Sequence, residues 1–216
     1  MLRLTDSPFW EAMVRSNLAT TRFELNDLDG AREAAERVLA LGPDSAPVAP
    51  RTAARLALIR MHIARADWDA ADEQVRLARE DLGGLGGREG LATAVRTAMG
   101  ELALGRGDAD GALRLAEEGL ENAQFAEKPV HIALLRLRGL ALGKERLEEA
   151  RAVLNDVRNM SRVMEMRLEE ARTLVAIGSR SVSDEALSDA EEIFTTCGCT
   201  RGLVEVAEAR RQLLRA

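Results

Sequence analysis

The sequence lacks tyrosine, and it has only two tryptophans, four phenylalanines, two histidines and two cysteines. Such a low aromatic content disfavours a β-sheet protein, because strands favour aromatic and β-branched side chains. Two cysteines cannot build a disulfide framework, and two histidines leave little for a His-rich metal site or a catalytic triad. No signal peptide is evident and no apolar run approaches a membrane span, so we expect a cytoplasmic protein with no membrane partner.

The apolar content, 46% of the residues, consists mainly of alanine, leucine and valine. This composition favours helices, and we predict an all-α protein. The net charge of −6 argues against nucleic acid as a partner, because binding to nucleic acid depends on cations that neutralise phosphates. All the cationic residues except Lys128 and Lys144 are arginines, which pair readily with carboxylates between helices.

A short segment recurs along the chain, as NDLDGAREA from residue 26, ADWDAADEQ from 66, GDADGALRL from 107 and KERLEEARA from 144. Its shared alanines, Ala31, Ala71, Ala112 and Ala150, are 40, 41 and 38 residues apart, and a weaker fifth copy places Ala186 in the same role. Each copy follows an apolar helical pattern and a turn too short for anything but a return. The pattern predicts stacked antiparallel helical hairpins with a small residue where the two axes are closest.

The predicted architecture is one domain over residues 1–216, with eleven helices in about five hairpins and a C-terminal capping helix. The hairpins are expected over 8–43, 47–83, 88–125, 129–160 and 162–197, and the capping helix over 200–215. The glycine-rich stretch 83–90 is interpreted as a linker. Helices are predicted over 8–25, 28–41, about 50–66, 68–82, 91–105, 109–125, 130–142, 147–160, 163–177, 184–196 and 202–214.

This repeat resembles the tetratricopeptide repeat, which implies a right-handed α-solenoid with a concave groove. The period is nearer 40 than the 34 residues of that family, and only the first copy ends in proline. The longer period and the ending IFTTCGCTRGLVEVAEARRQLL are similar to the superhelical repeats of large bacterial ATPase and LuxR-type regulators. The positions that match the tetratricopeptide repeat are Leu18, Ala19, Leu28, Ala31, Ala35, Val38, Pro43, Trp68, Ala71, Ala78, Gly100, Gly107, Ala112, Ala116 and Gly119.

No residue set indicates catalysis, a cofactor or a metal site, and we do not expect an enzyme. His62 and His131 are interpreted as packed or surface residues. Cys197 and Cys199 are interpreted as incidental thiols at a hairpin tip, since zinc needs four ligands. The acids of the recurring turns, such as Asp27, are expected to favour the N-terminus of the following helix.

The expected function depends on the groove lined by the first helices of the hairpins. Our first hypothesis is a scaffold that binds a peptide or a partner helix there. The second is a ligand-sensing module of a larger bacterial regulator, with a small-molecule effector, and the third is a structural homo-oligomer. The groove residues are predicted to be Asn17, Thr20, Phe23, Arg60, Ile63, Glu101, Leu104 and Arg136.

Overall fold

A computed structural model describes residues 7–83, 89–121, 128–143 and 146–214 of the chain. Within these ranges it contains eleven α-helices and no strand, so the predicted all-α class is confirmed. None of the described helices is both long enough and apolar enough to cross a membrane. The helices are α1 (Pro8–Glu24), α2 (Leu28–Ala40), α3 (Val48–Ala64), α4 (Trp68–Leu82), α5 (Glu89–Gly105), α6 (Ala109–Glu121), α7 (Lys128–Ala141), α8 (Leu147–Val163), α9 (Arg167–Ser181), α10 (Asp184–Cys197) and α11 (Thr200–Leu213).

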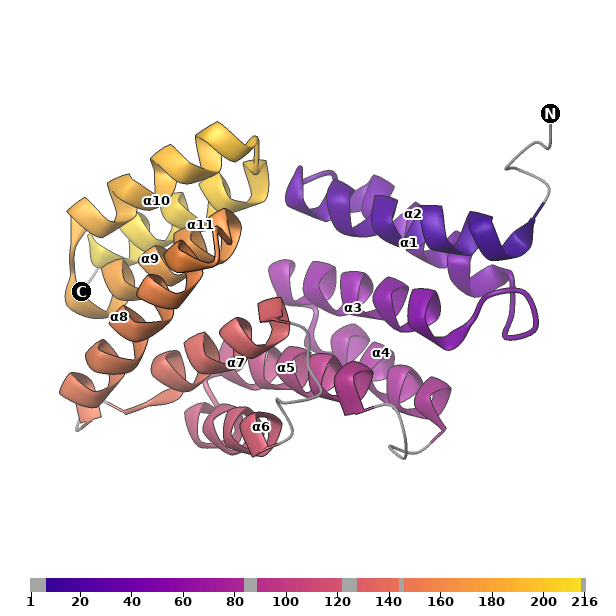
Figure 1. Ribbon diagram of the computed structural model, residues 1–216, viewed down its shortest axis with the longest axis horizontal. Coiled ribbons are helices and arrows are strands. Elements are labelled where there is room, and N and C mark those ends of the chain that lie inside the picture. Colours follow the sequence, from indigo (N-terminus) through magenta and orange to yellow (C-terminus); the bar gives the residue numbers. More distant parts are fainter. Residues whose placement is uncertain (1–6, 84–88, 122–127, 144–145, 215–216) are drawn as a thin grey trace.

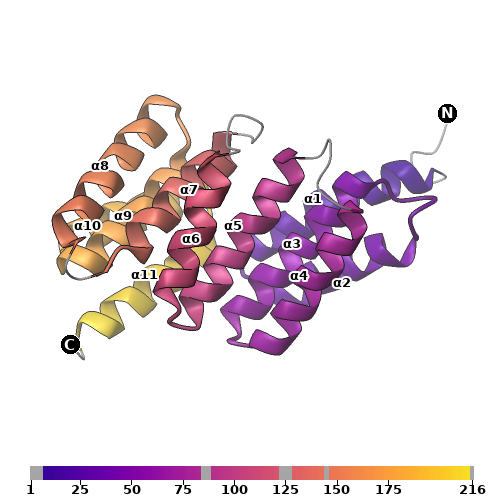
Figure 2. The same cartoon turned by 90° about the horizontal axis from the view of Figure 1, so that it is seen from below.

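The helices follow one another around a curve (Figure 1). Each helix packs against the next in the chain, and each odd-numbered helix from α1 to α9 also contacts the next odd-numbered helix. The odd-numbered helices therefore form an inner layer. Seen from below, α6 and α4 lie on either side of α5, with α2 beyond α4 (Figure 2).

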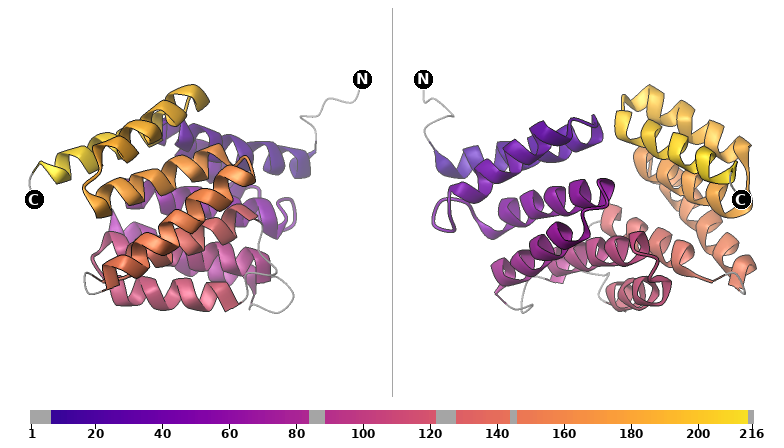
Figure 3. Two further views of the ribbon diagram at one scale, coloured as in Figure 1. Left: turned by 60° about the vertical axis from the view of Figure 1, so that its left-hand side comes forward. Right: turned by 180° about the vertical axis from the view of Figure 1, so that it is seen from behind.

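The curve closes on itself, because α1 contacts α11. From behind, the end of α1 faces the C-terminal helices across the molecule (Figure 3). Two segments at opposite ends of the described chain thus become neighbours. The repeat pattern contained no signal for this contact.

Small residues lie where the inner and outer helices cross. Ala31, Ala71, Ala112 and Ala150 are all fully buried, as the repeat predicted. A Cβ added to Gly119 on the outer helix α6 would lie 2.6 Å from a methyl group of Leu134 on the inner helix α7, which is far inside contact distance. These positions are small because close helix axes leave no room for larger side chains.

The turns after α1, α3 and α5 share one geometry. Asn26, Ala66 and Gly107 have φ angles of 60°, 54° and 84°, in the left-handed region. The amide of the residue after each of them donates to a carbonyl five residues earlier, at 2.8–2.9 Å. This backbone bond ends the incoming helix and turns the chain back at once.

The fourth such turn was not predicted. Glu165 has a φ of 57°, and the Met166 amide donates to the Ser161 carbonyl at 2.8 Å. The helix predicted to end at 160 therefore continues to Val163, and the helix predicted over 163–177 lies at Arg167–Ser181. The turn contains no glycine or proline, so composition gave no sign of it. The boundary placed near residue 161 between the fourth and fifth hairpins is wrong by about four residues.

Most other helix bounds agree with prediction to within about two residues, and α4 agrees at both ends. The predicted helix end at Phe125 lies outside the described residues, as does most of the glycine-rich linker.

Candidate binding hollows

The inner layer encloses two hollows. The larger has a volume of about 700 Å³, and α1, α3, α5, α7 and α9 all contribute side chains to it. Its apolar lining includes Met13, Leu56, Leu91 and Val130, while Ser16, Asn17, Thr20 and Thr97 supply polar groups. Residues in the first turns of α3, α5 and α7 also line it.

The smaller hollow, about 310 Å³, lies toward the other end of the inner helices. Apolar side chains, among them Phe23, Ile63, Leu140 and Val175, form part of its lining. Its charged lining consists of four arginines and two glutamates. Each of the four arginines is paired with a glutamate: Arg60 with Glu101, Arg136 with Glu169, Arg172 with Glu24 and Arg201 with Glu205.

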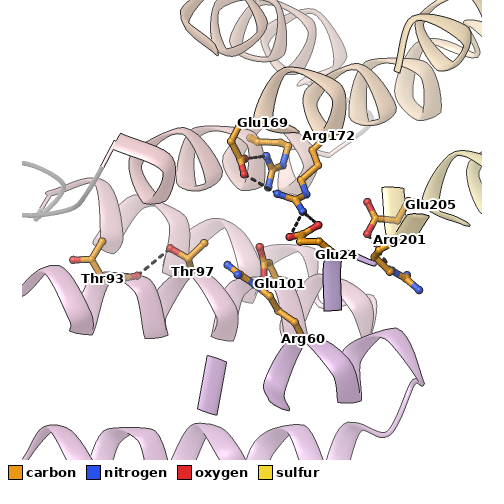
Figure 4. Close-up of polar contacts among 10 residues, drawn as sticks. Glu24, Arg60, Thr93, Thr97, Glu101, Glu169, Arg172, Arg201 and Glu205 are labelled. Atoms are coloured by element: carbon orange, nitrogen blue, oxygen red, sulfur yellow. Dashed lines mark hydrogen bonds and ion pairs between the residues drawn. The ribbon is translucent and has the colours of Figure 1, made fainter. Parts of the chain in front are cut away.

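Four residues line both hollows: Arg60, Glu101, Arg136 and Arg172. We call them the charged layer, because they form the boundary between the two hollows. Arg60 Nε lies 3.6 Å from Glu101 Oε2, which joins α3 to α5. Figure 4 shows these two side chains next to each other, below the contacts of Arg172. A ligand that reached from one hollow to the other would have to meet these groups.

Arg172 also closes the curve. It donates to both carboxylate oxygens of Glu24, 148 positions earlier in the chain, at 2.5 and 2.6 Å (Figure 4). The Cys199 thiol, at the start of α11, donates to the same carboxylate at 3.2 Å. We call this set of three side chains the closing contact. Burial, with a further contribution from Glu24, raises the pKa of Cys199 to about 11, so the thiol stays protonated and remains a donor.

Glu169 links α7 to α9 beside the closing contact. Its carboxylate accepts hydrogen bonds from Arg136 and from Arg172, the latter at 2.8 Å. Burial alone would raise the pKa of Glu169, but the two guanidinium charges and their hydrogen bonds outweigh burial and hold its pKa at about 2. The carboxylate is therefore ionised throughout the physiological range.

Most of the residues predicted to form the groove lie on these hollows. Arg60, Glu101 and Arg136 line both, whereas Leu104 is among the lining residues of neither. Leu104 is partly buried against the core between α6 and α7. The remaining predicted residues line one hollow each: Asn17 and Thr20 the larger, Phe23 and Ile63 the smaller.

The sequence reasoning missed Glu24, Glu169, Arg172 and Arg201. Thr20, Arg60 and Glu101 each lie eleven residues before the alanine that opens the second helix of their repeat, and this spacing selected them. Glu24 lies one turn beyond that position, and its partner comes from the far end of the curve. Because the turn at Glu165 was not predicted, α9 was placed about four residues too early, and its groove-facing residues were not identified. The only sequence feature that could have indicated these four residues was the presence of charged side chains on successive inner helices.

The other candidate residues have structural surroundings. Asp27 and Asp108 accept hydrogen bonds from backbone amides three residues later, at 2.9 and 2.8 Å, and so cap the helices that follow, as predicted. His62 Nδ1 lies 3.2 Å from Asp67 Oδ2. Cys197 is exposed, but Cys199 is buried in the closing contact, so its interpretation as an incidental thiol was wrong. Among the described residues, no cluster of His, Cys, Asp and Glu side chains could hold a metal ion.

Comparison with known proteins adds no family assignment. No protein-family model matches the chain, and no curated protein matches it significantly. The resemblance to tetratricopeptide repeats therefore stays a prediction.

Proposed function

We propose that the chain is a right-handed, tetratricopeptide-like α-solenoid that acts as a protein-interaction module. It binds an extended peptide or a partner helix in the larger hollow. The observation that carries this proposal is the larger hollow itself, because five helices from all parts of the curve each present side chains to it. A partner in this position would contact several repeats at once, as is typical of helical-repeat proteins.

The lining supports a peptide ligand. Apolar side chains such as Leu56 and Leu91 alternate with hydroxyl and amide groups such as those of Thr20 and Asn17. Apolar pockets bind side chains, and polar groups satisfy a peptide backbone, so this mixture suits a peptide better than a purely apolar ligand.

Ligand sensing is the second candidate function. Both hollows, about 310 and 700 Å³, fall in the size range of small-molecule sites, roughly 300–1,000 Å³. In this alternative a small molecule fills a hollow and changes the curvature of the helices. Thermal melting with peptides and with small metabolites separates the alternatives, because only the class of ligand that binds the native state raises the melting temperature.

The test of the first proposal is a selection of displayed random peptides on the full chain, followed by blocking of the hollow. Ala94 lines the larger hollow, and Ala94→Trp would fill part of it. Ala152, exposed on α8, provides a matched control as Ala152→Trp. We expect Ala94→Trp to weaken selected peptides about tenfold or more, and Ala152→Trp to have no effect.

Peptides that bind both variants equally would show that the larger hollow is not the site. If no peptide is selected but small metabolites raise the melting temperature, the sensing alternative replaces the first.

A further inference from the structure

Arg60 differs from the other arginines around the smaller hollow. Arg136 and Arg172 hydrogen-bond glutamates, and Arg201 reaches an acid one turn away in its own helix, at 3.2 Å. Arg60 has one long ion pair, 3.6 Å, and no hydrogen bond to any residue in the described ranges. Its guanidinium therefore keeps most of its donors for a ligand.

A ligand can also reach Arg60. Its side chain is 38% exposed and lines both hollows, so a ligand can reach it from the larger one. The other three arginines of the smaller hollow already pair with glutamates, Arg136 with Glu169, Arg172 with Glu24 and Arg201 with Glu205, so Arg60 is the one with donors to spare. The apolar side chains of Leu56, Phe23 and Ile63 line the hollows on either side of the charged layer, and such surroundings strengthen a charge pair relative to open water.

We propose that Arg60 receives an acidic side chain from the peptide segment that fills the larger hollow. The segment would carry this aspartate or glutamate between small aliphatic residues, which would pack on Met13, Leu91 and Val130. A carboxylate matches the planar guanidinium and forms two parallel hydrogen bonds with it. This inference rests on the proposed function and adds the chemistry of the ligand.

The test uses random peptides of about twelve residues, long enough for an extended strand or three helical turns. They are selected on the wild type, on Arg60→Met and on Arg114→Met, the last a control at an exposed arginine of the outer helix α6. We expect aspartate or glutamate between aliphatic residues in the peptides selected on the wild type and on Arg114→Met, but not in those selected on Arg60→Met. A Glu→Gln change in a selected peptide should weaken its binding to the wild type about tenfold and leave binding to Arg60→Met unchanged.

The outcomes separate the two proposals. Wild-type pools that bind through the larger hollow without acid enrichment would overturn the role of Arg60 and leave the peptide groove intact. If no peptide is selected, both the peptide-binding proposal and the proposed role of Arg60 are ruled out. Glutarate or hexanoate that raises the melting temperature where acidic peptides do not would identify a free small acid as the ligand and overturn the side-chain assignment. Circular dichroism of Arg60→Met checks that the variant is folded.

Discussion

Val182 is the β-branched residue among those of the described backbone with a left-handed φ. Asn26, Ala66, Glu165 and Val182 are the residues other than glycine that adopt a left-handed φ there. Asparagine tolerates this region, but a β-branched side chain does so rarely. Val182, which ends α9 with a φ of 54°, is 71% exposed, so its side chain gains little from burial in return.

Val182→Gly is therefore expected to stabilise the protein by about 1 kcal/mol, because glycine adopts this conformation without a steric cost. Val163, also exposed, has ordinary helical backbone at the end of α8. Val163→Gly should destabilise the protein by about 0.5 kcal/mol. Thermal melting measures both, and a lower melting temperature for Val182→Gly would contradict the argument.

At the scale of the helix, the repeat predicted most elements because local chemistry sets their ends. The acid of each turn, the small residue that opens the outer helix and the apolar period are all visible in one stretch of sequence. The turn at Glu165 was missed because it lies outside the recurring segments and contains no glycine or proline. The turn at Ala66 has the same backbone bond and no side-chain cap, but it lies in a recurring segment and was predicted.

Two equivalent acids offer a test of capping. Asp108 caps α6 through the Gly111 amide, whereas Asp67, at the same place before α4, makes no capping hydrogen bond and lies beside His62. We expect Asp108→Ala to lower stability by about 1 kcal/mol and Asp67→Ala by less than half of that. Chemical denaturation of the two variants provides the comparison, and equal losses would show that the capping bond contributes little.

At the scale of the helix crossing, the alanine at the start of each outer helix has no space around it. Ala112→Trp should lower the melting temperature by many degrees, because the indole would force α5 and α6 apart. Glu101→Ala should change it far less, since Glu101 is partly exposed and its ion pair is long. Similar melting curves for the two variants would contradict the predicted role of the alanines.

At the scale of the whole molecule, the pKa of Glu169 predicts an acid-sensitive fold. The folded-state pKa of about 2 lies below the ordinary value of 4.5, so the ion pairs contribute stability above pH 4.5 that is lost as the pH falls toward 2. The shift corresponds to about 3 kcal/mol at most. Unfolding free energy measured against pH should decline less steeply in Glu169→Gln, whereas Glu148→Gln, at an exposed position, should follow the wild type.

The closing contact predicts a change of shape. Glu24→Gln removes the charge that holds α1 to α9 and α11, so we expect a larger radius of gyration in small-angle scattering and faster hydrogen exchange in α1. Glu11 is a control on the same helix, because it pairs with two arginines, Arg15 and Arg37, but both lie within the first two helices. An unchanged radius in Glu24→Gln would show that packing alone closes the curve.

The contact between Glu24 and Arg172 has a consequence for how the chain folds. Helical arrays whose units touch only their neighbours can unravel from either end, one unit at a time. A bond across 148 positions joins the two ends, so neither can fray without disturbing the other. It must also close one of the longest loops in the described chain, which places its formation late in assembly. We therefore expect one concerted denaturation step in the wild type and separate steps once this bond is removed.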